Sequence, residues 1–283
     1  MQKNSHFDTL VVKDVPCLNL DLTFDCGQCF RFAKNSDGFW EGVIAGRKIM
    51  AKIEAGALIV VGQDILSVEK DILRFFDLDT DYAKILSHCQ NEPALRDAAS
   101  YSAGIRILRQ QPWEALCSFI ISQNNNIPRI KGIIERLCES FGDKIDGGGS
   151  FPSPDRLSRL RVEDLAVLRC GFRARYILDA AQKVHSGQVD FDAPASLPIA
   201  DARAHLMQIC GVGPKVADCA LLYGFHRLEA FPVDVWMSRA LKIFLPDGLP
   251  ESFSPYAGVV QQYLFHYIRG NYASVSAPDA GIS

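Results

Sequence analysis

The first sixty residues place apolar and polar side chains in short alternating runs. Asn-Ser-Asp-Gly at 35–38 and the Ala-Gly pairs at 45–46 and 55–56 interrupt these runs. Short alternating runs between turn residues are typical of antiparallel strands, in which successive side chains point to opposite faces. The pattern therefore predicts an antiparallel sheet. Its expected strands lie at 10–12, 29–32, 39–44, 49–53 and 58–61.

Helical spacing of apolar positions replaces this alternation after the last strand. Residues 68–88 follow it on either side of the acidic segment 77–81, Asp-Leu-Asp-Thr-Asp, which is expected to cap the second helix. From about residue 100 nearly every apolar run is helical. The helices expected there lie at 113–121, 130–141, 174–185 and 256–267, with another that begins at Ser153 and Pro154 after a loop of three glycines at 147–149.

These patterns predict an α+β protein with two domains. Residues 1–99 form an N-terminal antiparallel β-sheet domain with helices, and residues 100–270 form a mostly α-helical domain. Residues 271–283 are small and polar and are expected to be a disordered tail. A length of 283 residues and a hydrophobic content of 48% suit one or two domains with a full core.

The segment Gly211-Val212-Gly213-Pro214 joins two helical patterns. Glycines on both sides of one apolar residue allow a tight turn with positive φ, and proline suits the first turn of the helix that follows. The free amides at that helix start, together with the helix dipole, form a site for a phosphate. The sequence therefore predicts a helix–hairpin–helix that binds a nucleic-acid backbone without reading bases.

Lys215 and Asp234 could add chemistry to this hairpin. Lys215 occupies the second helical position, where the positive end of the dipole disfavours an ammonium group, and a neutral lysine can form a Schiff base. Asp234 follows Phe231-Pro232, which breaks the chain before the next helical run. Each residue alone has a simpler interpretation, a phosphate contact for the lysine and a helix N-cap for the aspartate. Together they indicate a catalytic amine and carboxylate.

The net charge and the distribution of basic residues bear on the ligands that this protein can bind. The net charge of −3 argues against a general DNA-binding protein but leaves room for a local basic face. No apolar run has the length of a membrane span and the N-terminus has no export pattern, so we expect a cytoplasmic protein, on the nucleoid if the source is bacterial, without membrane contact. Basic residues concentrated in the middle third are Arg106, Arg109, Arg129, Lys131, Arg136, Arg173 and Arg175; solvated helix faces are the alternative, favoured for Arg136.

Nine cysteines occur without a paired framework, which favours free thiols over disulfides. Cys26-Gly27-Gln28-Cys29 has the spacing of a metal or redox motif. However, no second pair and no histidine at zinc-finger spacing accompany it. We therefore expect no metal site made by side chains.

Several segments together resemble the 8-oxoguanine DNA glycosylases, a family of the helix–hairpin–helix glycosylase superfamily. They are the hairpin GVGPKVADC, the segment PVDVW with its aspartate, and the shorter motifs SQNNNIPR, FRARY and CGQCFRF. The matching segments run from about Cys17 to Arg269. The resemblance implies that the helical domain is a glycosylase domain. The lysine is similar to that of bifunctional members, which also cleave the DNA strand.

The resemblance implies roles for the residues around the damaged base. Gly27 matches the residue whose backbone carbonyl accepts from N7–H of 8-oxoguanine, where guanine has an acceptor instead. Gln261 matches the residue that binds the Watson–Crick edge, since an amide both donates and accepts. Phe265 and Cys219 match the two walls that sandwich the base. If the register is shifted by one residue, Gln262 takes the place of Gln261.

The resemblance also implies contacts with the opposite strand. Asn124 matches the asparagine that fills the gap left by the extruded nucleotide; in a run of three asparagines, the alternative is a simple helix C-cap. Arg129 and Arg173 match two arginines that hold the unpaired cytosine, whose O2 and N3 suit a guanidinium fork. Phe172 matches an aromatic wedge that is tyrosine in other members. Cytosine is therefore the expected partner of the lesion.

Contacts with the DNA backbone are implied for Gly211, Val212, Gly213 and Trp236. Backbone carbonyls around Met207, Ile209 and Val212 would hold a monovalent cation, by resemblance alone. Trp236 departs from the family pattern, because many relatives carry a histidine there that contacts a phosphate. Its indole N–H can still donate. The C-terminal region lacks the four-cysteine cluster of some superfamily members, so no iron–sulfur centre and no other cofactor are expected.

The implied function is that of a bifunctional DNA glycosylase and AP lyase in base excision repair. It would act as a monomer on double-stranded DNA and excise 8-oxoguanine through a Lys215 Schiff base followed by β-elimination. Two alternatives remain. A glycosylase for another damaged purine would keep the hairpin and Asp234 but usually not the lysine or the Gly27 motif. A non-catalytic DNA-binding module would need only residues 211–214.

Overall fold

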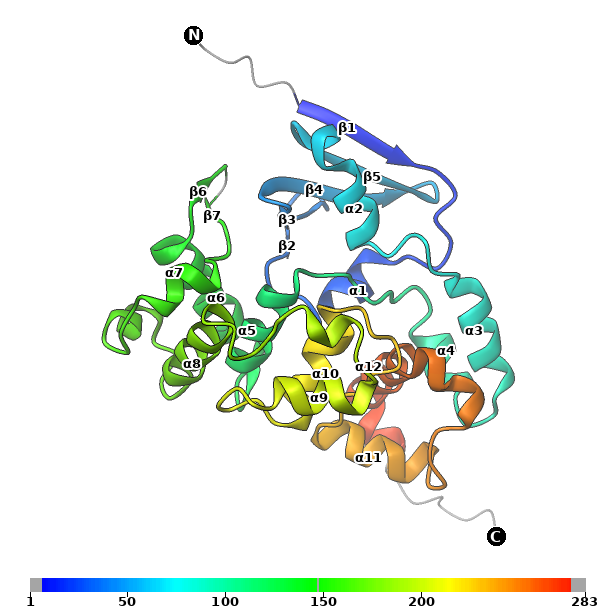
Figure 1. Cartoon of the computed structure of the whole chain (residues 1–283). Helices are drawn as coiled ribbons and strands as arrows, with labels where there is room; N and C mark the ends of the chain where they lie inside the picture. Colours follow the sequence, from blue (N-terminus) through cyan, green and yellow to red (C-terminus); the bar gives the residue numbers. More distant parts are fainter. Residues whose placement is uncertain (1–6, 147, 276–283) are drawn as a thin grey trace.

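The computed structural model describes residues 7–146 and 148–275. Five strands form one antiparallel sheet in the order β1-β5-β4-β3-β2, so β1 pairs with the last strand of the domain. The sheet lies above the helices that make up the rest of the chain (Figure 1). The strands are β1 Phe7–Val12, β2 Ala33–Lys34, β3 Trp40–Ile44, β4 Arg47–Glu54 and β5 Ala57–Gln63.

Two-residue turns set the register of the central strands. Ala45 and Gly46 have φ of 47° and 74°, and Ala55 and Gly56 have φ of 50° and 77°. Positive φ at both positions gives the turn whose twist matches two antiparallel strands. The predicted turns are confirmed. Alternate side chains of β3 and β5 are buried, as the sequence pattern requires.

The strand predicted at 29–32 is wrong, because this segment is irregular. Phe30 is buried in the core of the helical part, whereas Cys29 and Phe32 are buried in the core of the sheet domain. Alternate side chains that enter two different cores produce the same pattern as a strand with one buried face. The only strand next to this segment in sequence is the two-residue β2.

Helices make up most of the remaining chain. Asp81 accepts a hydrogen bond from the Lys84 amide, 3.0 Å, so the predicted cap is confirmed. The six-residue helices α1 and α4 were not predicted, because so few residues hardly show a helical period. The helices are α1 Leu20–Asp25, α2 Glu69–Phe75, α3 Tyr82–Asn91, α4 Arg96–Tyr101, α5 Pro112–Ser122, α6 Ile127–Phe141, α7 Pro154–Ser158, α8 Arg173–His185, α9 Ile199–Leu206, α10 Pro214–Tyr223, α11 Val235–Phe244 and α12 Ala257–Val275, with 3₁₀ turns at Ile65–Val68, Asp164–Leu168, Ala193–Ala195 and Glu251–Tyr256.

The glycine segment expected as a loop contains a short strand. Gly148–Gly149 is β7, which pairs with β6 (Lys144–Ile145). A Cβ at Gly149 would lie 2.0 Å from the carbonyl oxygen of Cys138, so only glycine lets this strand approach α6 so closely. Gly147 lies outside the described residues.

The tail expected to be disordered at 271–283 is wrong in part, because α12 continues to Val275. Asn271, with φ −126° and ψ 15°, kinks the helix. The ring of Tyr272 then packs edge-on against Trp236, with 5.4 Å between centroids. This tertiary contact favours the last helical turn, which the polar composition did not indicate. Residues 276–283 lie outside the described residues.

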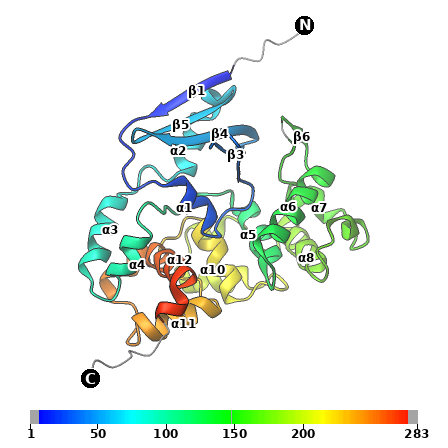
Figure 2. The same cartoon turned by 180° about the vertical axis from the view of Figure 1, so that it is seen from behind.

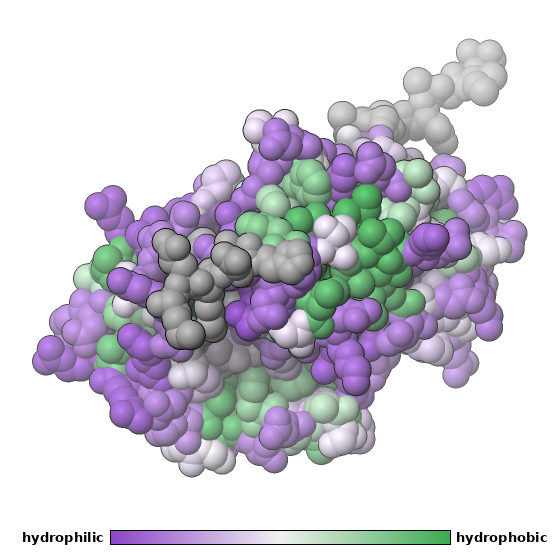
Figure 3. Space-filling view, turned by 90° about the horizontal axis from the view of Figure 1, so that it is seen from above, coloured by the Kyte–Doolittle hydropathy of each residue, from purple (hydrophilic) through white to green (hydrophobic). Residues whose placement is uncertain are grey.

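Two hydrophobic cores meet along α1 and the segment that follows it. In both opposed views α5 to α8 lie on one side of the helical part and α3 and α4 on the other, with α10 between them (Figures 1 and 2). The helix α4, which spans the boundary expected at residue 100, packs against α3 and α12. The face seen from above is hydrophilic with apolar areas (Figure 3).

Candidate active site

The hairpin joins α9 to α10 as the sequence predicted. Gly211 has φ of 78°, and Pro214 is the first residue of α10. Gly213 is the N-cap of α10 with φ of −92°, so positive φ is needed at one glycine and not at both. Buried Val212 anchors the turn in the core. The space around Gly213 is open, since a Cβ there would meet no atom within 4 Å.

Side chains of helix α8 contact the hairpin and bind its backbone. A Cβ at Gly211 would lie 2.3 Å from the ring of Tyr176. Asp179 accepts a hydrogen bond from the Cys210 amide, 2.6 Å, and Lys183 donates to the Gln208 carbonyl, 2.7 Å. The hairpin is therefore held in one conformation by contacts within the protein, and a ligand bound there would cost little backbone entropy.

Lys215 and Asp234 stand at the N-termini of two helices. Lys215 is the second residue of α10 and is half-buried, with its Nζ 5.2 Å from the ring centroid of Phe119. Asp234 is the N-cap of α11 and accepts a hydrogen bond from the Met237 amide, 2.8 Å. Asp234 is therefore a helix N-cap, as its simpler interpretation holds. The cap uses only one of the two carboxylate oxygens, so the other remains available as an acceptor. No ion pair within 4.0 Å binds either residue in the described part of the chain.

Cys219 lies one helical turn beyond Lys215 and shares its electrostatic environment. Burial raises the pKa of Cys219 to about 11. The charge of Lys215 and a hydrogen bond with it oppose this shift, whereas the charge of Asp234 adds to it. Lys215 and Asp234 therefore both lie close enough to Cys219 to influence its thiol. The thiol of Cys219 is therefore neutral near pH 7.

The loop at Gly27 lies against the C-terminal helix. Gly27 has φ of 84°, and a Cβ there would lie 3.9 Å from the ring of Phe265 and 3.8 Å from the guanidinium of Arg269. That guanidinium covers Phe265 at 5.3 Å from the ring centroid. The structure thus brings together Gly27 and Phe265, which are distant in sequence.

Adjacent glutamines on α12 have different surroundings. Gln262 accepts a hydrogen bond from the hydroxyl of Tyr223 and donates to the carbonyl of Cys26, 3.2 Å. Gln261 is 4% exposed, and its Oε1 has no hydrogen-bond partner among the described residues. Gln261 lies one turn before Phe265 on the same helix. An unpartnered buried oxygen is costly unless a ligand satisfies it, so Gln261, unlike Gln262, keeps an acceptor for a ligand.

The three asparagines after α5 also differ. Asn125 donates to the Ile121 carbonyl, 3.1 Å, and Asn126 caps α6 by accepting from the Arg129 amide, 3.0 Å. Asn124 is exposed with φ of 46°, and its side chain makes no hydrogen bond in the part of the chain that the structure describes. Of the three asparagines, Asn124 is therefore the one whose side chain is not tied to the backbone of the described residues.

The guanidinium of Arg173 donates hydrogen bonds to backbone carbonyls around this turn. It donates to the carbonyls of Gln123, Asn124 and Cys170, with an Nε–O distance of 3.0 Å to Gln123. Its side chain is buried, and burial, together with the nearby charge of Arg129, lowers the pKa of Arg173. Arg173 thus positions the turn in the free protein.

Next to it, Phe172 and Arg129 are exposed. Phe172 is 50% exposed, and the guanidinium of Arg173 lies 4.5 Å from its ring centroid. Arg129 has a weak contact, 3.4 Å, with the carbonyl of Arg169. Both side chains are free to contact a strand laid across this surface.

Trp236 belongs to a cluster that the sequence did not reveal. The guanidinium of Arg239 lies 5.1 Å from the ring of Trp236 and 5.0 Å from that of Tyr272. Sequence reasoning also missed Phe119 and Tyr223, which stack at 5.1 Å beside Lys215. No local signal distinguishes these aromatic residues from ordinary core residues.

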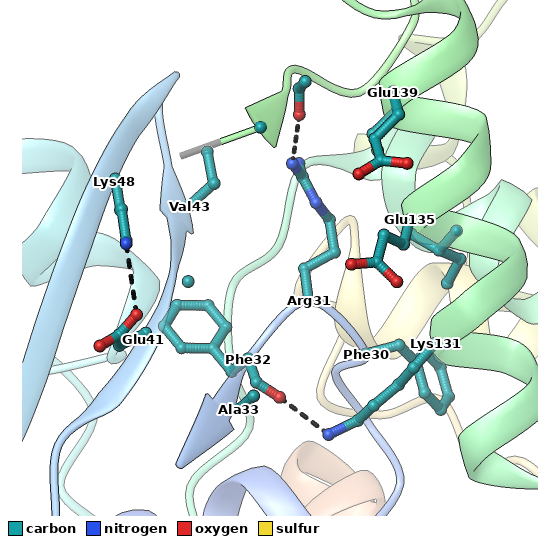
Figure 4. A pocket seen from close by; sticks show the side chains of 15 residues that line it. Phe30, Arg31, Phe32, Ala33, Glu41, Val43, Lys48, Lys131, Glu135 and Glu139 are labelled. Atoms are coloured by element: carbon teal, nitrogen blue, oxygen red, sulfur yellow. Dashed lines mark hydrogen bonds and ion pairs between the residues drawn. The ribbon is translucent and has the colours of Figure 1, made fainter. Parts of the chain in front are cut away.

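A cavity of about 390 Å³ lies elsewhere, between the sheet domain and α6 (Figure 4). Arg31 extends into it, donating to the Gly149 carbonyl, 2.7 Å, and pairing with Glu114, 3.2 Å. A neighbouring cavity of about 410 Å³ shares Arg31 and Phe32. None of the predicted site residues lines either cavity, so both belong to the domain boundary.

The described residues, 7–146 and 148–275, contain no group of three histidine, cysteine or acidic side chains placed to hold a metal ion. Cys26 and Cys29 are buried, and burial raises the pKa of each thiol to about 12. None of the helices described could cross a membrane, by length and apolar content.

Comparison with protein families covers most of the chain. Residues 10–116 match the family described as 8-oxoguanine DNA glycosylase, N-terminal domain. Residues 117–247 match the HhH-GPD superfamily of base excision DNA repair proteins. The second match includes the hairpin, Lys215 and Asp234.

Curated relatives are similar over much of their length. The N-glycosylase/DNA lyase OGG1 of Arabidopsis thaliana is 32% identical over 275 residues, which cover 90% of this chain and 74% of the relative. The N-glycosylase/DNA lyase of Saccharomyces cerevisiae is 37% identical over 196 residues, 64% of this chain and 52% of the relative. The chain therefore spans about half of the yeast protein.

Solved structures are similar over almost the whole fold. MBOgg1 in complex with a low-affinity DNA ligand has a TM-score of 0.87 and 39% identity, covering 95% of this chain and 97% of that one. The Clostridium acetobutylicum 8-oxoguanine glycosylase/lyase, bound to double-stranded DNA with cytosine opposite 8-oxoguanine, has a TM-score of 0.86 and 33% identity. The coverage is 94% of this chain and 96% of that one.

Proposed function

This chain belongs to the 8-oxoguanine DNA glycosylase family and is a glycosylase with lyase activity, and we propose that it excises 8-oxoguanine opposite cytosine through a Schiff base on Lys215. The observation that carries the proposal is the amine itself. Lys215 stands at the start of the hairpin helix without an ion-pair partner among the described residues, and it is hydrogen-bonded to Cys219, whose thiol also feels the charge of Asp234.

The chemistry follows from these positions. Asp234 stabilises positive charge that develops on the sugar as the bond between C1′ and the base lengthens. The Nζ lone pair of Lys215 forms a bond to C1′, while the base leaves with the electron pair of the broken bond and takes up a proton. Opening of the sugar ring gives the Schiff base. Loss of a C2′ proton then expels the 3′ phosphate, which cuts the strand 3′ of the abasic site.

Lesion recognition is assigned to the Gly27 loop and α12. N7 carries a hydrogen in 8-oxoguanine and a lone pair in guanine, so the Gly27 carbonyl attracts one base and repels the other. Gln261 supports this role because its buried Oε1 lacks a partner. Phe265 and Cys219 would stack on the two faces of the base. A mispaired buried polar group costs about 1–3 kcal/mol, so this contact supplies about one to two orders of magnitude of selectivity.

Recognition of the opposite strand is assigned to Asn124, Arg129 and Arg173. The free side chain of Asn124 fills the gap. Arg129 is exposed and can bind cytosine directly. Arg173 can bind it only by exchanging some of its bonds to the carbonyls of Gln123 and Asn124, which couples the base contact to the turn that carries Asn124.

The hairpin is assigned to the DNA backbone. The open surface at Gly213 and the first amides of α10 suit a phosphate. A monovalent cation would sit at the carbonyls of Met207, Ile209 and Val212. The Ile209 carbonyl already accepts from the Val212 amide, 3.0 Å, and keeps one lone pair for such an ion. The cation would neutralise phosphate charge at the hairpin.

Borohydride trapping tests the proposal. The substrate is a duplex with 8-oxoguanine opposite cytosine, and Lys215→Gln is measured beside the wild type. We expect a covalent adduct and base release from the wild type, and no adduct from the variant. Replacing the opposite cytosine by adenine should slow base release at least tenfold, because the guanidinium contacts are lost.

Other outcomes discriminate the alternatives. Base release without an adduct would keep the substrate and remove Lys215 as nucleophile. Release of an alkylated purine instead of 8-oxoguanine would assign the other glycosylase class. DNA binding without any base release would indicate a non-catalytic module.

A further inference from the structure

Three glutamines surround the Gly27 loop, and the mechanism above uses none of them. Gln28 is fully buried, Gln110 is 7% exposed and Gln262 is 1% exposed. Buried amides are costly unless every hydrogen bond is satisfied, so their presence at one loop calls for a specific explanation. They come from three different parts of the chain, namely the loop itself, the segment before α5, and α12.

The amides of two of them hold the carbonyls on either side of Gly27. Gln262 Nε2 donates to the carbonyl of Cys26, 3.2 Å, and Gln110 Nε2 donates to the carbonyl of Gln28, 2.7 Å. The Gly27 carbonyl between them accepts no hydrogen bond from the described residues. The flanking peptide groups are thus fixed, and the middle carbonyl alone remains available.

Gln28 fastens the loop to the segment that follows α4. Its Nε2 donates to the carbonyls of Thr23, 3.0 Å, and Arg106, 2.8 Å. Its Oε1 accepts from the Leu108 amide, 2.9 Å. Both ends of this side chain are therefore occupied, and the loop cannot shift without breaking several buried hydrogen bonds.

Tyr223 fixes the orientation of Gln262. Its hydroxyl donates to Oε1 of Gln262, so the amide nitrogen must face the Cys26 carbonyl. Tyr223 is on α10, two turns beyond Lys215, and its ring stacks on Phe119, over which Lys215 lies. This chain of contacts connects the helix of the nucleophile to the lesion-recognition loop.

We propose that Gln262, oriented by Tyr223, is a positioning residue for lesion recognition, which holds the Gly27 carbonyl at one fixed place. The inference rests on the proposed function. A fixed carbonyl repels the N7 lone pair of guanine, whereas a mobile carbonyl can withdraw and relieve that repulsion. Rigidity of the loop therefore supplies selectivity, and the selectivity falls when the amide or its orientation is lost.

The experiment compares Gln262→Met, which keeps the side-chain length, with Tyr223→Phe, which only frees the amide to rotate. Single-turnover base release is measured on duplexes with 8-oxoguanine or guanine opposite cytosine. Strand cleavage at a preformed abasic site needs no base recognition and is measured in parallel. We expect the ratio of 8-oxoguanine to guanine release to fall about tenfold in both variants, while abasic-site cleavage stays within about twofold.

Tyr263→Phe is the matched control. Tyr263 adjoins Gln262 and is equally buried, but its hydroxyl has no hydrogen-bond partner in the part of the chain that the structure describes. Its removal should change neither rate. An unchanged ratio in Tyr223→Phe and Gln262→Met would overturn the inference, as would an equal loss of both activities in a folded variant, which would indicate a general structural role. If the wild type releases no 8-oxoguanine, the proposed function itself fails.

Discussion

At the residue scale, similar side chains acquire different roles from their hydrogen bonds. Asn125 and Asn126 are tied to the backbone, and Asn124 is free. Gln262 is tied at both ends, while Gln261 keeps a buried oxygen without a partner. A side chain that forms hydrogen bonds with neighbouring residues stabilises the free protein, whereas a side chain with unpaired polar atoms is available to DNA.

The two hairpin glycines should respond differently to alanine. At Gly211 the new Cβ would lie 2.3 Å from the Tyr176 ring, on backbone with φ of 78°. Gly211→Ala should therefore lower the free energy of unfolding by on the order of 1–3 kcal/mol and weaken DNA binding. Denaturant unfolding and fluorescence anisotropy with labelled duplex measure both quantities.

Gly213→Ala is the control for this prediction. Its φ of −92° suits any residue and no atom lies within 4 Å, so stability should be unchanged. DNA binding should still weaken if a phosphate approaches here. Equal stability of both variants would contradict the argument about Tyr176.

At the element scale, the end of α5 depends on a side chain from α8. Arg173 binds the carbonyls of Gln123 and Asn124, where a helix end has free acceptors. The turn that presents Asn124 is therefore held by a helix that begins fifty residues later in the chain. The conformation of the turn after α5 and the candidate function of Asn124 therefore both depend on Arg173.

Arg173→Met and Arg129→Met separate the two roles of these arginines. Arg173→Met removes the donor to the carbonyls of Gln123, Asn124 and Cys170, of which the Cys170 contact is buried, and should cost about 1–3 kcal/mol of stability. Arg129→Met removes an exposed charge and should leave stability within about 0.5 kcal/mol. Both should reduce the preference for cytosine opposite the lesion, measured as base release from duplexes that differ only in the opposite base. Retained preference in both variants would remove the arginines from that role.

At the scale of the whole molecule, Asp77 connects the two domains. It is fully buried and accepts hydrogen bonds from Thr80, 2.9 Å, and Tyr82, 2.7 Å. Arg109, before α5, donates to it at 2.7 Å, and His226, after α10, lies 3.0 Å away. Burial alone would raise the pKa of Asp77, but its partners, His226 and Tyr82 and Arg109, together lower it below the usual value.

Because of these contacts of Asp77, the free energy of unfolding should decrease at acid pH. A lowered folded-state pKa means that the carboxylate stabilises the fold above the unfolded pKa of about 4, and that this stability is lost as pH falls through the lower folded pKa. Asp77→Asn should cost about 3–5 kcal/mol at pH 7, because the guanidinium of Arg109 loses its anion. Its unfolding free energy should also fall less between pH 5 and pH 2 than that of the wild type. Parallel pH profiles would exclude Asp77 as a source of acid sensitivity.

Much of this organisation could be predicted from local patterns. Paired turn residues at 45–46, the cap at Asp81 and the glycines beside Pro214 each act through backbone preferences within a few residues. The two incorrect predictions, at residues 29–32 and 271–275, have tertiary packing as their common cause. Residues 29–32 alternate because two cores meet there, and residues 271–275 are helical because Tyr272 packs on Trp236.

By itself the sequence determined the α+β class, the hairpin, and the places of Lys215 and Asp234 at the starts of two helices, because these depend on short-range conformational preferences and motifs. Only the tertiary structure decided which asparagine and which glutamine are free, where Gly27 meets Phe265, and that Tyr223 orients Gln262. Those facts depend on partners that are distant along the chain. Packing and hydrogen bonding bring such partners together only when the whole chain has folded.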